Sequence, residues 1–284
     1  MILIADSGAT KTDWCFGTTL HDCQIIHTEG INPFHLTEEK IRQILQESLI
    51  QQLPFSKEEV KAIFFYGAGC TPEKAGKLSG LLAEVFPYAS IQVESDLLGA
   101  ARALCRHQPG IACILGTGAN SCLYDGQRIT HHTPPLGYIL GDEGSGAYLG
   151  KRFVSDCIKQ QLPTDLLEGL LKEYNLTIPD ILDKVYRQPQ GNRFLASLTP
   201  YIYKYKNRPE VRQFLTGCFS DFFRRNILPY PEHTQIPISF VGSIAWFFQD
   251  ELKEAARKFH LHCGIFIQSP IQELKGFHLP EKTL

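Results

Sequence analysis

The feature that most constrains this chain is a pair of apolar segments separated by a polar turn at its start. Residues 2–5 are apolar and run into Asp6, and residues 14–16 are apolar again. The intervening segment, 7–13, is rich in small residues and hydroxyls and contains one Lys. This pattern predicts a strand, a tight turn and a second strand. Small residues, hydroxyls, a Lys and a carboxylate also suit a nucleotide-phosphate site, although most turns of this composition are only turns.

The chain is long and apolar enough to bury a sizeable core. It has 284 residues, of which 43% are hydrophobic and 20% charged, so one large domain or two ordinary ones are expected. The net charge is −2, and no basic run or interleaving of basic and aromatic residues occurs. We therefore expect no nucleic-acid partner.

The sequence also argues against a membrane protein and against a disulfide or zinc scaffold. No stretch of about 18 apolar residues occurs, and Asp6 interrupts the first apolar run, so neither a membrane span nor a signal peptide is expected. The nine cysteines are scattered, with no C-x-x-C or C-x-C spacing. Thiols in such numbers fit a reducing compartment, so a cytoplasmic location is expected.

Apolar periodicity and turn residues predict strands and helices after the opening segments. Strands are expected at 13–18, 23–28, 61–66 and 90–94. Helices are expected after Thr37, with an apolar stripe at 41, 44, 45 and 49, then from Thr71-Pro72 to about 86, and from Ser95-Asp96 to 105.

The pattern then begins again. An apolar run at 111–115 enters a second turn of glycines and hydroxyls at 116–121, followed by strands at 122–124 and 128–133. At an offset of 110 residues, Ser7-Gly8-Ala9-Thr10 lies over Thr117-Gly118-Ala119-Asn120. Two similar α/β units in tandem usually enclose a ligand between them.

The rest of the second half predicts a helical insert and a return to strands. We expect a helix after the run 141–146 that ends near 161, several helices within 164–228, a strand at 237–241, a helix at 244–259 and a strand at 262–267.

Four motifs in this order carry a resemblance to a known family. They are Asp6–Thr12, the turn 115–120, the run Gly141-Asp142-Glu143-Gly144-Ser145-Gly146, and 240–243 before a helix. Together they resemble the sugar kinase/Hsp70/actin superfamily, and within it the BadF/BadG/BcrA/BcrD ATPase family, which includes N-acetylglucosamine kinases. The resemblance implies an α/β fold with two tandem ribonuclease H-like (actin-like ATPase) domains and an active site in the interdomain cleft. The domains expected are 1–109 and 110–284, with the helical insert at about 164–228 in the second.

The resemblance also implies an activity. It predicts an ATP-dependent kinase that phosphorylates an amino sugar, N-acetylglucosamine and/or N-acetylmuramic acid, with ATP and Mg²⁺ as cofactors. The partner expected is a small-molecule amino sugar. The oligomeric state stays open, with a homodimer as one option.

Site residues follow from the positions that match the family's motifs. Asp96 is the expected catalytic base, and Asp6 is expected to hold Mg²⁺, often through water. The residues expected to bind ATP are Ser7, Gly8, Thr10, Lys11, Thr12, Gly116, Thr117, Gly118, Gly217, Gly242 and Ser243. The residues expected to bind the sugar are Asn32, Asp96, Asn120, Gly137, Tyr138 and Asp142.

Each of these residues also has a purely structural interpretation. Ser95-Asp96 can simply cap a helix, and Asp6 can make a local turn bond. Lys11 can neutralise phosphate charge or be a solvated turn residue. Asp142-Glu143 can favour the N-terminus of the next helix. His131 and His132 are adjacent on a strand and point to opposite faces, so they are not expected to be metal ligands.

The chain departs from the family pattern in three places. Ser7 stands where the family usually has Gly, and Pro135-Leu136-Gly137-Tyr138 stands where it often has Gly-Gly-Trp-Gly. The segment from Ser269 is short and poorly patterned, so the helix that usually packs back on the first domain is expected to be reduced.

Two other functions remain open at this stage. The first is an ATPase that activates a 2-hydroxyacyl-CoA dehydratase, whose Gly-rich turns hold cysteines for an Fe–S cluster. Here both turns lack Cys, and only Cys70, after Gly67-Ala68-Gly69, has a comparable setting. The second is a non-catalytic sugar- or ATP-sensing protein, which the presence of the candidate base and metal carboxylates disfavours.

Overall fold

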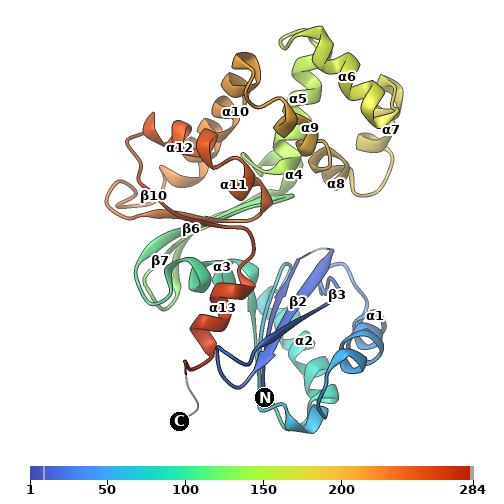
Figure 1. Cartoon of the computed structure of the whole chain (residues 1–284), viewed down its shortest axis with the longest axis vertical. Coiled ribbons are helices and arrows are strands. Elements are labelled where there is room, and N and C mark those ends of the chain that lie inside the picture. The colour runs from blue at the N-terminus through green and yellow to red at the C-terminus, as the bar shows by residue number, and fades with distance from the viewer. Residues whose placement is uncertain (9, 282–284) are drawn as a thin grey trace. The chain divides into compact units, whose positions relative to one another are not determined.

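The computed structural model describes residues 1–8 and 10–281, so Ala9 of the opening turn lies outside them. The chain divides into two compact units (Figure 1). The N-terminal unit comprises Met1–Gln108, Gly126–Ile129 and the described residues that follow Gln268, and the C-terminal unit comprises Pro109–Asp125 and Thr130–Gln268. This division differs from the single boundary expected at 109/110, because two later segments pack with the N-terminal unit.

The N-terminal unit is built on a five-stranded mixed sheet with the order β3-β2-β1-β4-β5. Its strands are β1 Ile2–Ser7, β2 Lys11–Gly17, β3 Gln24–Glu29, β4 Ala62–Gly67 and β5 Ser90–Ser95. β1 pairs antiparallel with β2, and β2 with β3, whereas β4 and β5 continue the sheet in parallel. The predicted strand, turn and strand at the start of the chain are confirmed.

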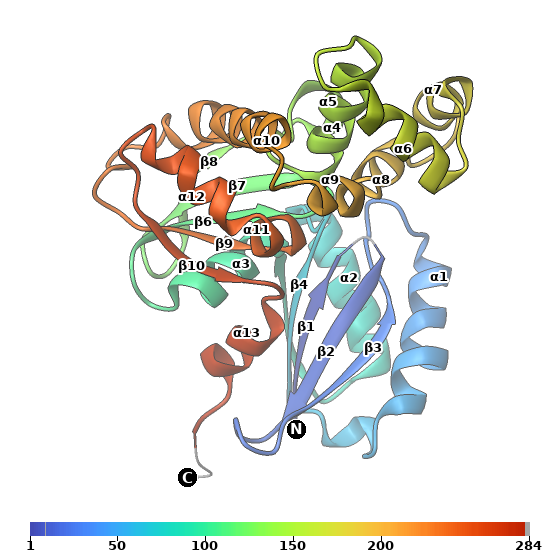
Figure 2. The ribbon, with the colours of Figure 1, turned by 45° about the horizontal axis from the view of Figure 1, so that its top comes forward.

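Alternating side chains give this sheet two different faces. One face buries Leu3, Trp14 and Phe65 in an apolar core against α1 and α2. The opposite face carries Asp6 and Tyr66, and α3 and α13 lie over it (Figures 1 and 2). The helices of this unit are α1 Glu38–Gln43, continued by η1 Ile44–Leu49 and η2 Ile50–Gln52, then η3 Lys57–Glu59, α2 Pro72–Val85, α3 Asp96–Cys105 and α13 Ile271–His278.

Side-chain caps fix the starts of the predicted helices. The side chains of Thr37, Thr71 and Ser95 each accept a hydrogen bond from the backbone N–H three residues later. The apolar stripe expected after Thr37 is confirmed, since Ile41, Ile44, Leu45 and Leu49 are all buried.

The C-terminal helix α13, eight residues long, packs on the N-terminal unit. Tyr66 Oη lies 2.7 Å from Nε2 of His278, whose ring stacks on Phe64 with centroids 3.8 Å apart. Arg102 of α3 donates to the same Tyr66 oxygen at 2.6 Å and lies 5.3 Å from the centre of the Phe277 ring. These long-range contacts hold a segment whose own sequence shows little periodicity.

The C-terminal unit repeats the sheet plan of the N-terminal unit. Its strands are β6 Gly110–Leu115, β7 Ala119–Tyr124, β8 Ile129–Thr133, β9 Ile238–Val241 and β10 Cys263–Ile267. Their order is β10-β9-β6-β7-β8, with β6 antiparallel to β7 and parallel to β9. Read from β8, this is the order found in the first sheet, as the sequence offset between the two turns predicts.

The helices of the C-terminal unit include the predicted insert (Figure 2). They are α4 Gly137–Leu140, α5 Gly146–Ile158, α6 Thr164–Tyr174, α7 Ile178–Tyr186, α8 Gly191–Ala196, α9 Thr199–Lys204, α10 Pro209–Phe222, η4 Phe223–Ile227, α11 Ser243–Phe247 and α12 Gln249–Arg257. The single helix expected at 244–259 is instead two helices, because the backbone leaves the helical conformation at Phe248. The core joins these helices to the sheet through Phe153, Phe219, Phe222 and Phe240.

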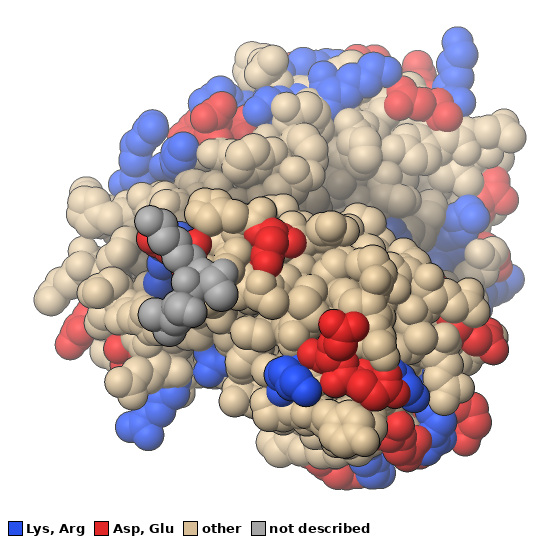
Figure 3. All heavy atoms as spheres, turned by 60° about the horizontal axis from the view of Figure 1, so that its bottom comes forward, with Lys and Arg blue, Asp and Glu red and all other residues tan. Residues whose placement is uncertain are grey.

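No helix among residues 1–8 and 10–281 is long and apolar enough to cross a membrane. On the face drawn in Figure 3, Lys and Arg side chains are scattered among acidic and uncharged ones.

Candidate active site

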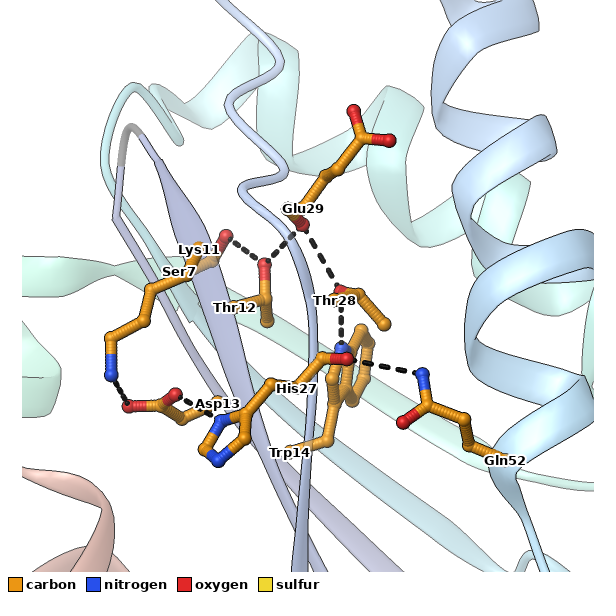
Figure 4. A network of polar contacts seen from close by, with 9 residues as sticks. All are labelled: Ser7, Lys11, Thr12, Asp13, Trp14, His27, Thr28, Glu29 and Gln52. Carbon is orange, nitrogen blue, oxygen red and sulfur yellow. Dashed lines mark hydrogen bonds and ion pairs between the residues drawn. The ribbon is translucent and has the colours of Figure 1, made fainter.

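The strands beside the first predicted phosphate turn, β1, β2 and β3, carry a row of ionisable side chains on one face of the sheet. Asp6 on β1 is the cross-strand partner of Asp13 on β2, and Asp13 is the partner of His27 on β3. Lys11 Nζ lies 2.9 Å from Oδ2 of Asp13, and His27 Nδ1 lies 2.7 Å from its Oδ1 (Figure 4). Asp13 therefore holds Lys11 beside the turn, which favours a structured position for that cation over a purely solvated one.

Asp6 has an environment that suits a bound cation. Its pKa is raised to about 7, mainly by burial and also by the charges of Asp13 and Asp96, while Lys11 opposes the shift. A divalent cation would relieve this repulsion. No cluster of three or more His, Cys, Asp or Glu side chains suited to a metal occurs among the described residues. Asp6 and its cross-strand partner Asp13 offer the one or two carboxylates by which Mg²⁺ is commonly held, together with phosphates and water.

Ser7 and Thr12 use their hydroxyls inside the protein. Both side chains are fully buried, and Ser7 Oγ lies 2.6 Å from Oγ1 of Thr12. The backbone N–H of Ile31 donates to both oxygens, at 2.9 and 3.1 Å. The two hydroxyls thus tie the first turn to the loop that carries Asn32. The other predicted ATP-binding residues of this turn, Gly8 and Thr10, are exposed.

Asn32 is buried, and its amide is held in one orientation. Its Oδ1 accepts the backbone N–H of Phe34 at 2.9 Å. Gly69 follows β4 with a φ of +76°, and a Cβ at that position would lie 2.3 Å from Asn32 Oδ1. Asn32 can therefore occupy its position only because residue 69 has no side chain.

Asp96 is the first residue of α3, and Ser95 is the cap. Ser95 Oγ accepts the N–H of Leu98 at 3.2 Å, so the carboxylate of Asp96 is not needed for capping. Burial raises the pKa of Asp96, and the backbone N–H groups of Leu97 and Asp96 partly offset that rise. A carboxyl with a raised pKa near the metal candidate Asp6 has the properties of a general base.

The second predicted phosphate turn, Gly116–Gly118, is fixed by two helices of the C-terminal unit. The first N–H groups of α5 donate to it, Gly146 to Gly116 O at 2.8 Å and Ala147 to Thr117 O at 3.1 Å. Gly242, which precedes α11, has a φ of +117°, and a Cβ there would lie 2.4 Å from Leu115 O. The structure thus brings Gly242 and Ser243 next to Gly116.

A cavity of about 310 Å³ opens beside Ser243. Its walls are largely apolar and aromatic, formed by Thr199, Pro200, Tyr203, Ser243, Ile244, Phe247 and Phe248. Tyr203 and Phe247 are both partly exposed, and their ring centres lie 5.6 Å apart. A planar aromatic base fits such a pocket by stacking.

Asp142 and Glu143 have different surroundings. Asp142 lies at a φ of +57° and accepts the N–H of Ala119 at 3.3 Å, and burial raises its pKa to about 6. A Cβ on Gly118 would lie 3.2 Å from the Asp142 carboxylate, so the second turn and Asp142 lie side by side. Glu143 is paired instead with Arg225 at 2.7 Å and with the amide of Asn226 at 3.3 Å. Of the two acids, Asp142 is the one placed beside the second turn.

Asn120 and Tyr138, two further predicted sugar contacts, are each held by a side chain that the sequence did not single out for this purpose. Asn120 Oδ1 lies 2.8 Å from His132 Nε2. Lys151 of α5 donates to the backbone oxygen of Tyr138 at 2.7 Å and so holds the short helix α4, which also contains Gly137. The positive charge of Lys151 also partly opposes the rise in the pKa of Asp142.

Gly217 is the one predicted ATP-binding residue that the structure does not group with the others of its unit. It lies on α10 and lines a separate cavity of about 780 Å³ with Arg152, Asp221 and Lys258. A Cβ at Gly217 would meet no atom within 4 Å, so packing does not require glycine there. Its role in nucleotide binding stays a prediction.

Sequence reasoning missed Asp13, Gly69, Lys151 and the role of His132. Asp13 had a usable signal, because a strand pair closed by a short turn puts it opposite Asp6. The other three act on residues that are remote in sequence, 37 positions away for Gly69 and Asn32, and no local pattern marks such contacts.

Comparisons with known proteins relate the chain to N-acetylglucosamine kinases. No family model matches the chain. Over 98% of its length the chain is 44% identical to a proposed N-acetylglucosamine kinase of Porphyromonas gingivalis, whose solved structure is covered to 98% with a TM-score of 0.93. An N-acetylmuramic acid/N-acetylglucosamine kinase of Clostridium acetobutylicum is 26% identical over 210 residues, which are 68% of this chain and 67% of that protein.

The fold extends to actin-like proteins. The structure of MreB 5 of Spiroplasma citri, bound to AMPPNP, is 13% identical and has a TM-score of 0.59, with 98% of this chain and 95% of that chain covered. This similarity concerns the fold alone. Together with the two matching sheets, it confirms the predicted fold class.

Proposed function

Because this chain belongs to the N-acetylglucosamine kinase-like members of the BadF/BadG/BcrA/BcrD ATPase family, we propose that it phosphorylates N-acetylglucosamine, N-acetylmuramic acid or both. The phosphoryl donor is ATP. The structural observation that carries the proposal is the relation between Asp96 and Asp6. Asp96, at the start of a helix, has a raised pKa, and its charge acts on Asp6, the candidate metal ligand.

The chemistry assigned to Asp96 is general base catalysis. The oxygen of the sugar hydroxyl attacks the γ-phosphorus of ATP, its proton passes to the Asp96 carboxylate, and the bond from the γ-phosphorus to the bridging oxygen breaks to release ADP. Because Ser95 already caps α3, Asp96 is available for this task. Such a base contributes about 10²- to 10⁴-fold to the rate of a reaction.

Nucleotide binding is assigned to both turns and to the cavity beside Ser243. In the N-terminal unit, Lys11 contributes positive charge and Asp6 would hold Mg²⁺, which supplies charge neutralisation for the phosphates. In the C-terminal unit, the Gly116–Gly118 turn supplies backbone N–H groups and the Thr117 hydroxyl. The aromatic cavity formed by Tyr203 and Phe247 is assigned to the adenine ring.

Sugar binding is assigned to Asn32, Asn120, Tyr138 and Asp142. Asn32 and Asn120 offer amide groups, and Asp142 offers a carboxylate, which are the polar groups that hydroxyl and acetamido substituents require. The two asparagines are both held in fixed orientations, which supports recognition of a defined sugar over a loosely bound polar ligand.

The test is an ADP-release assay with four acceptors: N-acetylglucosamine, N-acetylmuramic acid, glucosamine and glucose. We expect one or both N-acetylated sugars to stimulate ATP turnover above the rate without acceptor. If none of the four sugars does so, the proposal is wrong.

The dehydratase-activator alternative is not favoured. Cys70 is the one cysteine in a comparable turn, and burial, with the charges of Asp96 and Glu94, raises the pKa of its thiol to about 12. Both predicted phosphate turns also lack the cysteines that would hold such an Fe–S cluster. Stoichiometric iron in anaerobically purified protein would reverse this judgement.

A further inference from the structure

The orientation of the Asn120 side chain can be deduced from its donors. The N–H of Ser121 lies 3.0 Å from one polar atom of the Asn120 amide. A backbone N–H can only donate, so that atom is the oxygen, Oδ1. His132 Nε2 lies 2.8 Å from the same oxygen, so this nitrogen must carry a hydrogen and donate it.

These two donors leave one group of Asn120 for a ligand. An amide oxygen has two lone pairs, and both are now used within the protein. The nitrogen Nδ2, with two hydrogens, is the group that remains. Asn120 is only partly buried, so a ligand can reach this amide.

We propose that His132 is a positioning residue for sugar recognition, which fixes the Asn120 amide so that its NH₂ group faces the sugar and contacts an acceptor atom on it. This inference rests on the proposed function. Without His132, the amide loses one of its two anchors, and the rotated form, with oxygen toward the sugar, becomes populated. In that form the amide can no longer donate to the acceptor atom on the sugar.

The neighbouring histidine provides a matched control. His131 and His132 are adjacent on β8 and, by strand alternation, point to opposite faces. His131 contacts only the Thr130 hydroxyl in the hydrogen bonds that the structure describes for it, at a long 3.4 Å. Its removal tests for any general effect of losing an exposed imidazole from this strand.

The experiment compares His132→Ala, His132→Gln and His131→Ala in steady-state kinetics. We expect His132→Ala to raise the KM for the sugar about five- to tenfold, the effect of one lost hydrogen bond, with the KM for ATP unchanged. His132→Gln should restore most of the sugar KM, because the glutamine amide nitrogen can donate as Nε2 does. His131→Ala should leave both KM values unchanged. In a protein that already carries Asn120→Ala, His132→Ala should not raise the KM for the sugar further.

A sugar KM that is unchanged in His132→Ala, or an equal effect in His131→Ala, would overturn the inference while leaving the kinase proposal intact. Failure of the wild-type protein to use any sugar would instead contradict the proposed function. A second measurement does not depend on turnover: the ¹⁵N shifts of the His132 imidazole report which nitrogen carries the hydrogen. Hydrogen on Nε2 supports the inference, and the tautomer with a bare Nε2 overturns it.

Discussion

Ser7 Oγ lies 2.6 Å from Thr12 Oγ1, and the backbone N–H of Ile31 donates to both oxygens. Ser7 stands where the family usually has Gly. Its hydroxyl makes hydrogen bonds that a glycine could not make. These hydrogen bonds connect the first phosphate turn directly to the loop of Asn32, although the two segments are far apart in the sequence. A residue expected to bind ATP is thereby linked to a residue expected to bind the sugar.

Removal of either hydroxyl should therefore affect sugar binding as well as stability. Ser7→Ala or Thr12→Val leaves the buried N–H of Ile31 with one acceptor fewer, and we expect a loss of about 1–3 kcal/mol in the free energy of unfolding, measured by denaturant titration. The KM for the sugar should rise more than the KM for ATP. Thr10→Ala, in the same turn but exposed, should cost little stability. Equal losses in all three variants would contradict this account.

Asp96→Asn should separate catalysis from binding. The amide keeps the size of the side chain but cannot accept the hydroxyl proton, so kcat should fall about 10²- to 10⁴-fold. ATP binding, measured by calorimetry, should be nearly unchanged.

Glu73→Gln is the control for the structural interpretation of Asp96. Glu73 is also an acid in the first turn of a helix, α2, and is exposed. If an acid at a helix start mattered only through the helix dipole, the two variants would behave alike. A normal kcat in Asp96→Asn would remove this residue from the mechanism.

Gly69→Ala should impair sugar binding selectively. Its added Cβ would lie 2.3 Å from Asn32 Oδ1 and would sit at a positive φ, so Asn32 must move. A displaced contact of this kind costs about tenfold or more in kcat/KM for the sugar. The KM for ATP should stay the same.

Gly76→Ala in helix α2 is the matched control. A Cβ there meets nothing within 4 Å, so the substitution should stabilise the protein by about 0.5–1 kcal/mol through helix propensity. Similar kinetics for the two variants would show that Gly69 does not position Asn32.

Mg²⁺ binding should be linked to the titration of Asp6. The raised pKa of Asp6, about 7, means that protons compete with the cation below neutral pH. We expect the affinity for Mg²⁺ in the presence of ADP, measured by calorimetry, to rise from pH 6 to pH 8 more steeply in the wild type than in Asp6→Asn. The titration of ADP itself is common to both proteins and cancels in the comparison. Identical pH dependence would exclude Asp6 as a metal ligand.

The sequence predicts those parts of the fold whose causes are local. The strands and turns around Asp6 and Gly116 follow from apolar runs interrupted by glycine and hydroxyl residues, and Ser95 at the start of α3 follows from capping chemistry. Helix α13 has no such local cause, because it is held by Tyr66 and Arg102 from elsewhere in the unit. Contacts made across the fold leave no mark in a single sequence.

The same distinction explains what was missed in the candidate site. The residue types expected to bind phosphate and sugar could be chosen from the motifs. The residues that hold them in place, Asp13 for Lys11 and Gly69 for Asn32, become visible only through strand register and close approach.

Two partly buried groups of the N-terminal unit, His278 and Asp6, should give the free energy of unfolding opposite dependences on pH. Burial and the charge of Arg102 lower the pKa of His278 to about 4, so the unfolded chain binds more protons than the native one between about 4 and 6.5. Stability from this group therefore increases as pH rises through that range. Asp6, with its pKa raised from 3.8 to about 7, is protonated in the native state while the unfolded chain is not. Its contribution is lost as pH rises from about 4 to about 7.

The two effects partly cancel in the wild type and should be separable by substitution. With no Mg²⁺ or nucleotide added, Asp6→Asn should leave the His278 effect, so the free energy of unfolding rises from pH 4.5 to pH 7 relative to the wild type. His278→Gln should leave the contribution of Asp6. The free energy of unfolding should then fall from pH 4.5 to pH 7 relative to the wild type. Denaturant titrations at four pH values across this range measure both slopes. Changes of the same sign in the two variants would contradict at least one of the two assigned shifts.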